Sequence, residues 1–322
     1  MSPFDKANEL ATEYIPQPEF SAHVKEGYWK AAFGLQAVDG LAPSRYARRL
    51  ADEHIRGTAT LADVMQQLGT YYSSNSKNHD QAQTEEADKV SARIVELLST
   101  PAFSLDWELL PQIHRHLFQD LDASVYHPGA LRTEPLVKLE AVLNGDTLLY
   151  GAPSLIARSL EVLFSKERDY RYATYSDGGT GLCYADLAHF VGFVSDVWFT
   201  HPFWEGNTRT VAVFCELYLN YLGFNVNNEP FEKGSAFFRN ALVRANYRNR
   251  AAGVDVDFTP LTTFFSNVLG DGDEPLRDED VYCKPLFARP ELVRNVDHAF
   301  AMPYQEELKR MGITETVLAK PE

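Results

Sequence analysis

Apolar side chains recur at helical spacing in two stretches near the middle of the chain, and a short polar segment separates them. Gly223 follows the second stretch and predicts its end. We therefore expect two buried helices joined by a loop at residues 201–210. The apolar positions are Leu187, Phe190, Val191, Val194, Val197 and Trp198 in the first helix, and Val211, Phe214, Leu217, Tyr218, Tyr221 and Leu222 in the second.

The N-terminal region has a similar periodicity. Between Tyr28 and Tyr72 it predicts three short helices, of which the first ends at Asp39-Gly40. Ser44 and Thr60 are typical residues before a helix and predict where the second and third begin. The stretch Ser73–Ala87 is rich in Ser, Asn, Gln and acidic residues, which is typical of a linker.

One β-hairpin interrupts the helical pattern. Short apolar runs flank Asn144-Gly145, and this dipeptide is a strong hairpin signal, so we expect a hairpin over Leu139–Tyr150. A core helix is expected over Ser235–Tyr247. The fold class is therefore mainly α, with one short hairpin. We divide the chain into an N-terminal helical part with its linker, a central core and a C-terminal helical extension: 1–104, 105–250 and 251–322.

Composition limits the classes of function. The net charge of −15 argues against nucleic acid as the main partner, because phosphate backbones need clustered Lys and Arg. Three scattered cysteines suggest reduced thiols and no zinc site. No apolar run reaches membrane-spanning length, and the first residues lack the apolar core of a signal peptide. We expect a cytoplasmic protein with no membrane partner; the sequence leaves a homo-oligomer open.

The loop between the two central helices concentrates groups suited to phosphate chemistry. Gly206, Asn207 and Thr208 stand at the start of the second helix, where free amides and the helix dipole attract anions. Arg209 would add a permanent positive charge at the same place. Two neighbours supply the rest of such a site.

Those neighbours are His201 and Glu205. His201 is the candidate general base for an attacking hydroxyl, because an imidazole can accept a proton near neutral pH. Glu205 is the candidate ligand of a hard divalent ion that bridges phosphates. The alternative is a plain helix–loop–helix corner in which Asn207 caps the second helix. As a loop residue at the helix junction, His201 is expected to contribute little packing.

The segment His201-Pro-Phe-Trp-Glu-Gly-Asn-Thr-Arg209 resembles the signature of the Fic family, His-x-Phe-x-(Asp/Glu)-Gly-Asn-Gly-Arg-x-x-Arg. The resemblance implies a Fic-type helical core that transfers AMP from ATP to a Ser, Thr or Tyr hydroxyl of a target protein, with self-modification. It implies that His201 is the base, that Glu205 binds Mg²⁺, and that Asn207, Arg209 and the loop amides hold the phosphates. The target would dock by strand addition on a hairpin flap at Leu139–Tyr150; an ordinary surface hairpin is the alternative.

Two positions depart from that signature. Thr208 replaces the second glycine, so its backbone should adopt ordinary angles. Ala212 replaces the last arginine, which in the family contacts the γ-phosphate and pairs with an inhibitory glutamate. Arg239 or Arg244, on the expected helix over 235–247, is a candidate replacement cation. The usual role of such arginines is to solvate a helix face.

Two further segments resemble parts of Fic proteins. Residues 113–133 run from a helix into a Pro-Gly-Ala-Leu-Arg segment similar to the opening of a Fic core. Its histidines, His114 and His116, are two residues apart, which is poor spacing for one helix face and favours packed or surface roles over a metal site.

The N-terminal helices resemble the antitoxin-type module that inhibits many Fic proteins. In the best register Asp39 stands at the inhibitory glutamate and Gly40 at the glycine that follows it. With alanine at 212, we expect Asp39 to have no cation to bind, so that the module remains as a scaffold. The alternative is a plain helical domain that never touches the nucleotide site.

Together these features favour an ATP- and Mg²⁺-dependent protein adenylylyltransferase. The alternatives are transfer of another phosphate-containing moiety and a non-catalytic Fic-fold protein that binds nucleotide or a partner.

Overall fold

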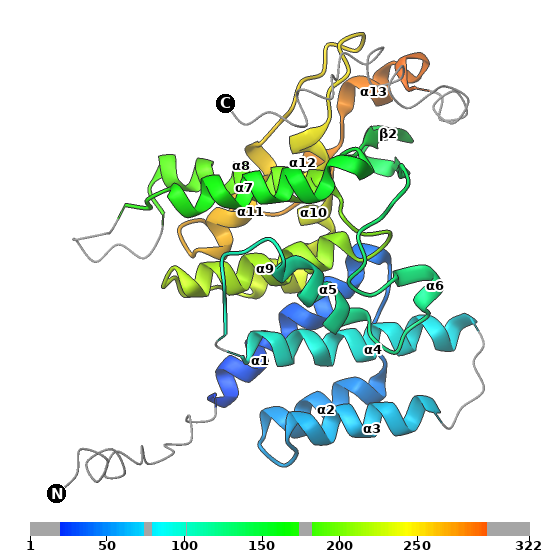
Figure 1. Ribbon diagram of the computed structural model, residues 1–322, viewed down its shortest axis with the longest axis vertical. Helices are drawn as coiled ribbons and strands as arrows, with labels where there is room; N and C mark the ends of the chain where they lie inside the picture. The colour runs from blue at the N-terminus through cyan, green and yellow to red at the C-terminus, as the bar shows by residue number, and fades with distance from the viewer. Residues whose placement is uncertain (1–19, 74–78, 101, 174–181, 295–322) are drawn as a thin grey trace, which may run out of the picture.

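The computed structural model of the chain describes residues 20–73, 79–100, 102–173 and 182–294, and Figure 1 shows their arrangement. The mainly helical class with one short hairpin is confirmed. The helices are α1 (Ala22–Gly34), α2 (Arg45–Ile55), α3 (Leu61–Ser73), α4 (His79–Leu98), α5 (Leu109–Phe118), α6 (Ala123–Tyr126), α7 (Ile156–Asp169), α8 (Tyr184–Thr200), α9 (Asn207–Tyr221), α10 (Glu229–Asn246), α11 (Thr259–Val268), α12 (Asp278–Val281) and α13 (Lys284–Ala288).

The three predicted N-terminal helices are present as α1, α2 and α3. A 3₁₀ helix, Leu35–Asp39, extends α1 and ends at Gly40, whose φ of 71° favours glycine. Ser44 caps α2 by accepting a hydrogen bond from the Ala47 amide at 3.0 Å. The sequence signals for the ends of these helices were therefore sufficient.

The predicted linker is wrong where the structure describes it. Residues 74–78 lie outside the described part of the chain, but 79–87 belong to the long helix α4. Ala87, Val90 and Ile94 are fully buried and follow helical spacing, a pattern that the polar composition of the stretch obscured. In Figure 1 α4 lies between the α2–α3 pair and α5, and it contacts α3, α5 and α9.

α1 joins the N-terminal helices to the rest of the molecule by packing on α4 and α10. The approach to α10 is close: a Cβ added at Gly34 would lie 2.3 Å from the Phe231 carbonyl oxygen. One continuous cluster of buried apolar side chains extends from Trp29 to Leu286. The three sequence segments therefore share a core, and their boundaries stay a prediction.

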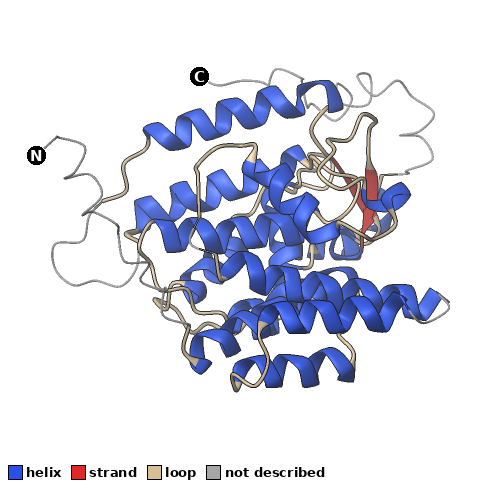
Figure 2. Ribbon diagram, turned by 60° about the horizontal axis from the view of Figure 1, so that its bottom comes forward, coloured by secondary structure: helices blue, strands red, loops and turns tan. Residues whose placement is uncertain are grey.

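The hairpin consists of β1 (Val137–Glu140) and β2 (Asp146–Leu149), drawn in red in Figure 2. The strands are antiparallel, and Lys138 pairs with Leu148 while Glu140 pairs with Asp146. The turn contains a 3₁₀ helix, Ala141–Leu143, followed by Asn144 and Gly145 with positive φ. The predicted hairpin is confirmed, with a longer connection than a two-residue turn.

The C-terminal extension braces this hairpin from behind. The Cys283 amide donates to the Val142 carbonyl oxygen at 2.9 Å, and Arg294 contacts the Asp146 carboxylate at 3.0 Å. Asp146 is fully buried and also accepts a hydrogen bond from the Tyr247 hydroxyl at 2.6 Å. The extension was predicted only as helical packing; it also fixes the hairpin turn.

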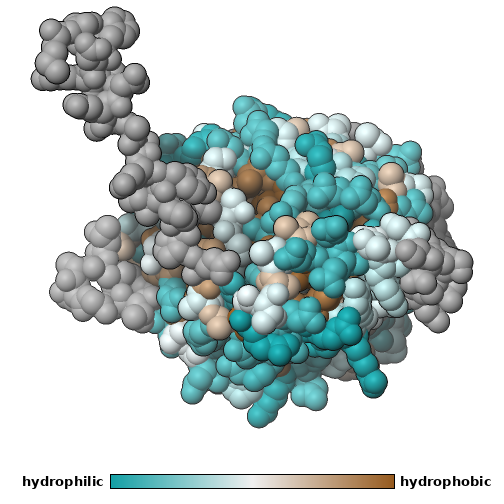
Figure 3. Space-filling model, turned by 90° about the horizontal axis from the view of Figure 1, so that it is seen from below, coloured by the Kyte–Doolittle hydropathy of each residue, from teal (hydrophilic) through white to brown (hydrophobic). Residues whose placement is uncertain are grey.

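The surface fits the acidic, polar composition. The face over α2 and α3, seen from below in Figure 3, is mainly hydrophilic, and apolar side chains show only in scattered spots. Each helix within the described residues is too short or too polar to cross a membrane. All three cysteines are unpaired, as expected.

Glu216 of α9 is an exception in the core. Its side chain is fully buried, and neither carboxylate oxygen has a hydrogen-bond partner within the described residues. Burial raises the pKa of Glu216 to about 8. Between its unfolded and folded pKa values, only the folded state holds the proton, so stability must fall as pH rises across this window.

We predict that Glu216→Gln becomes progressively more stabilising, relative to wild type, as pH rises from 5 to 8. Each pH unit in this window should lower the wild-type free energy of unfolding by up to about 1.4 kcal/mol through this group. Thermal or urea unfolding at several pH values measures the difference. The exposed Glu161→Gln is the control and should show no such trend. A pH-independent difference for Glu216→Gln would contradict the buried, protonated state.

Candidate functional site

The loop of residues 201–206 joins α8 to α9, as predicted. His201 ends α8 in the left-handed conformation, with φ 45° and ψ 62°, and its amide donates to the Trp198 carbonyl oxygen. Gly206 precedes α9 with φ 73°. A Cβ on Gly206 would lie 2.2 Å from the Phe118 ring, so the close approach of α5 also requires glycine here. Thr208 lies within the first turn of α9 and avoids positive φ, as predicted.

The loop is held by side chains that bond to its backbone. Asn207 accepts from the Phe203 amide at 2.9 Å and donates to the Phe203 carbonyl at 2.7 Å, so it braces the loop and does not act as the N-cap. The Arg132 guanidinium donates to the His201 carbonyl oxygen at 2.6 Å. The backbone amide of Arg132 donates to the Pro202 carbonyl oxygen at 2.8 Å. In this conformation, both ends of the Asn207 amide are occupied by the loop itself.

His114 supports the same loop from α5. Its ring is fully buried, lies 3.0 Å from the Glu205 carbonyl oxygen and accepts a hydrogen bond from the Gly129 amide. His116 instead contacts Glu96 at the surface. The packed and surface roles predicted for these histidines therefore agree with their burial and contacts.

The His201 ring is enclosed. It is 3% exposed and stacks on Tyr150, with ring centroids 3.7 Å apart. The expectation that it contributes little packing is therefore wrong: α8 ends inside the molecule, so the ring meets aromatic neighbours and no solvent. Neither ring nitrogen has a hydrogen-bond partner in the described part of the chain. A substrate could reach either nitrogen only if the pocket opened.

The electrostatic surroundings keep this imidazole neutral. Burial lowers the pKa of His201 well below its usual value, and the positive charges of Lys138, Arg132 and Arg239 lower it further. A neutral ring with an unpartnered nitrogen is the form that accepts a proton.

Glu205 stands beside His201 on the pocket wall with its side chain 39% exposed. The Lys138 ammonium lies 3.0 and 3.2 Å from its two carboxylate oxygens. A carboxylate is a suitable ligand for Mg²⁺, so the residue fits its predicted role, but a metal would have to displace or adjoin Lys138.

Arg209 turns away from the pocket and into the N-terminal helices. Its guanidinium is 1% exposed and lies 2.8 Å from Asp39 and 2.6 Å from Glu86. It also donates to the Gln36 side chain at 3.1 Å and covers the Phe118 ring. Burial lowers the pKa of Arg209, but the two carboxylates outweigh this and raise it. In this conformation Arg209 connects α9 to the N-terminal helices.

Asp39 therefore does have a cation, contrary to our expectation. The expectation considered only the arginine missing at 212, whereas Arg209, one turn earlier on α9, reaches Asp39. The alternative of a plain helical domain remote from the site is also wrong, because Asp39 lines the pocket of His201. Gly40 has open space around it and only terminates the 3₁₀ helix.

Of the two candidate replacement arginines, the structure brings only one to the pocket. Arg239 of α10 lines it and pairs with the fully buried Glu140 at 2.7 Å. Arg244 lies 3.9 Å from Asp257 and is not among the residues that line this pocket.

The pocket is too small for a nucleotide in this conformation. Its cavity volume is about 10 Å³, which is room for roughly one water molecule. The pairs Lys138–Glu205 and Arg239–Glu140 narrow it, and Asp39 forms part of its wall. The lining residues are Asp39, Lys138, Trp198, His201, Glu205, Gly206, Asn207, Thr208 and Arg239.

Sequence reasoning missed Lys138, Glu86 and Arg132 as parts of this site. Lys138 was detectable in principle: the segment Val137–Glu140 alternates apolar and charged residues, so Lys138 and Glu140 share one face of β1. The role of Glu86 was not detectable, because it lies 123 residues from Arg209 and within the segment that was expected to be a linker.

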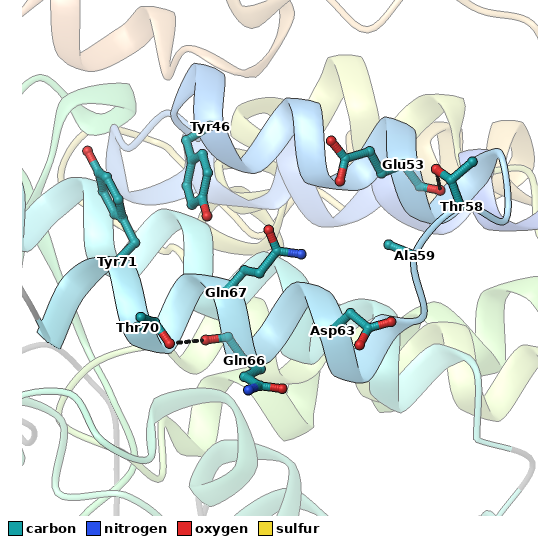
Figure 4. Close-up of a pocket in the computed structure, with 9 residues that line it drawn as sticks. All are labelled: Tyr46, Glu53, Thr58, Ala59, Asp63, Gln66, Gln67, Thr70 and Tyr71. Atoms are coloured by element: carbon teal, nitrogen blue, oxygen red, sulfur yellow. Dashed lines mark hydrogen bonds between the residues drawn. The ribbon is translucent and has the colours of Figure 1, made fainter.

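A second depression in the surface contains none of the motif residues. It lies between α2 and α3 and is shown in Figure 4, with Tyr46 and Tyr71 at one end. Several of its polar groups are satisfied locally: the Thr58 and Thr70 hydroxyls donate to the Glu53 and Gln66 carbonyl oxygens. None of its lining residues has a pKa shifted as far as that of His201.

The central part of the chain is similar to a known protein family. Residues 104–219 match the model of the Fic/DOC family, and this stretch extends from just before α5 through most of α9. A crystal structure of a Fic-domain-containing signalling protein from Bacteroides thetaiotaomicron is similar over 85% of this chain and 93% of that chain, at 16% identity and a TM-score of 0.44. No curated protein matches the chain.

We predict that Glu86→Gln weakens the connection between α4 and α9. Arg209 would keep one of its two carboxylates, and replacing a charged hydrogen-bond partner in a buried pair should lower the free energy of unfolding by about 1–3 kcal/mol. Urea unfolding measures this loss. The control is Glu26→Gln, which removes an exposed pair with Lys30 and should cost clearly less, because water screens the charges of a surface pair. Equal losses for the two variants would show that Glu86 contributes no more than a surface pair.

Proposed function

We propose that this chain transfers AMP from ATP to a Ser, Thr or Tyr hydroxyl of a target protein, and to itself. Fic/DOC proteins generally transfer phosphate-containing groups onto proteins, which supports the reaction class. The observation that carries the proposal is His201: a buried, neutral imidazole whose two ring nitrogens have no partner among the described residues, on the pocket wall beside the start of α9.

In the proposed step, the hydroxyl oxygen of the target attacks the α-phosphorus of ATP. His201 accepts the hydroxyl proton, the new P–O bond forms, and the bond to the β-phosphate oxygen breaks to release pyrophosphate. The first amides of α9, at Asn207 and Thr208, have no intrahelical acceptor and lie at the positive end of the helix dipole, which suits them to phosphate oxygens. Arg239 also lines the pocket, where it is paired with the buried Glu140.

Glu205 is the proposed Mg²⁺ ligand, and a bound ion would offset the negative charge of the nucleotide phosphates. The target is proposed to dock along the hairpin, where Leu139 is 63% exposed on the outer face of β1. The same proposal places the reaction in the cytoplasm, in keeping with three unpaired cysteines.

The test is incubation of the purified protein with Mg²⁺ and ATP labelled at either the α- or the γ-phosphate. Label from the α-phosphate on protein supports AMP transfer. Label from the γ-phosphate alone would instead indicate phosphate transfer. No label from either would favour a nucleotide- or partner-binding protein without turnover.

We predict that His201→Asn lowers the rate of α-labelling by about 10²–10⁴, the usual cost of losing a general base. Asparagine tolerates the left-handed backbone of this position, so the loop should be retained. Circular dichroism and calorimetric ATP binding serve as controls of folding and of the nucleotide site. Wild-type labelling in this variant would remove His201 from the role of base.

We further propose that Asp39 restrains the site, since it draws Arg209 away from the pocket. Asp39→Asn should raise the rate of α-labelling, because Arg209 would lose one of its two anionic partners and could turn toward the phosphates. The exposed Asp52→Asn is the matched control. A rate that is unchanged or lower in Asp39→Asn would show that the pair supports the site and does not restrain it.

A further inference from the structure

Lys138 holds a position on Glu205 that resembles that of a metal ion. Its ammonium is in contact with both carboxylate oxygens, at 3.0 and 3.2 Å, and both residues line the pocket of His201. An ammonium carries three N–H donors, so this contact leaves one donor for a further acceptor. A cation with an anion on one side and a spare donor can bridge Glu205 to a second anion.

The other positively charged side chains near His201 are bound to other partners. Arg132 donates to backbone carbonyl oxygens of the loop, and Arg209 is buried between two carboxylates. Arg239 is neutralised by Glu140, which is fully buried and also accepts from the Tyr150 hydroxyl. Lys138 differs because its side chain is 25% exposed and its partner is a partly exposed carboxylate of the pocket wall.

Lys138 is also held firmly in place. It pairs with Leu148 across the hairpin, and Glu140, the next residue on the same face of β1, is anchored to α10. The turn of the hairpin is tied to the C-terminal extension through Val142 and Asp146. The ammonium is therefore presented by a braced strand.

Lys138 balances a negative charge in the wall of the pocket. Of the charged residues that line the pocket, Asp39 pairs with Arg209 and Arg239 pairs with Glu140, so Glu205 and Lys138 balance each other. Without Lys138, the Glu205 carboxylate would be an unpaired negative charge next to a ligand whose phosphates are themselves anionic. Like charges at such distances repel strongly when partly shielded from water.

We infer that Lys138 is a phosphate-binding residue of this site and that its ammonium stands in for the divalent ion on Glu205 when no metal is bound. The inference rests on the proposed function for the identity of the ligand, a nucleotide phosphate. It follows that ATP binds without metal and that Mg²⁺ adds little affinity, because the metal must take a place that Lys138 already fills.

Calorimetric titration of the full chain with ATP, in EDTA and in Mg²⁺, tests this directly. Wild type should bind in EDTA, with less than a threefold gain from Mg²⁺. In Lys138→Met, which keeps the length of the side chain, the dissociation constant in EDTA should rise at least tenfold, and Mg²⁺ should recover most of the loss. Lys233→Met, at an exposed surface pair, should behave as wild type.

Equal affinities of wild type and Lys138→Met in EDTA would overturn the inference, as would wild-type binding that requires Mg²⁺. A loss that Mg²⁺ does not recover would show that Lys138 holds phosphate but does not replace the ion. If wild type binds ATP through Lys138 but no label is transferred to protein, the proposed function fails while the inference stands. If wild type binds no ATP in either condition, both fail.

Discussion

The buried guanidinium of Arg209 is the constraint around which the rest of this molecule is arranged. A fixed positive charge at 1% exposure must be balanced, since an unpaired ion in the interior costs several kcal/mol. The balance comes from Asp39 at the end of the first helical segment and from Glu86 on α4. The N-terminal helices and the motif helix α9 consequently have to be docked together for either to be electrostatically satisfied. The same two parts of the chain also share one apolar core, which extends from Trp29 to Leu286.

Much of the fold was predictable because its signals are local. The helices on either side of the 201–206 loop show uninterrupted helical periodicity. Ser44 predicts the start of α2, and Asn144-Gly145 predicts the turn of the hairpin. The error at α4 has the same origin, because its first turns are polar and a local composition rule mistakes them for a linker. Their buried positions become clear only when Ala87, Val90 and Ile94 are considered as one stripe.

The site was predictable in its members but not in their partners. The motif identified His201, Glu205 and Arg209, and the structure places them around one loop. What sequence could not supply was the pairing: Arg209 with Asp39 and Glu86, and Glu205 with Lys138. A single sequence does not show which residues of distant segments form an ion pair, because many acidic residues could pair equally well with a given arginine or lysine. The chosen partner depends on how helices pack, which decides the direction in which each long side chain extends.

The brace between the C-terminal extension and the hairpin defines the smallest piece of this protein that can retain its site. A fragment ending at residue 250 would include the motif and the whole of the family match, yet it would lose Cys283 and Arg294. Asp146 would then remain buried without its arginine, and the strand that carries Lys138 and Glu140 would lose the support of its turn. The contacts that hold the site in place therefore extend beyond the matched segment 104–219: they include Asp39, which follows α1, and Arg294.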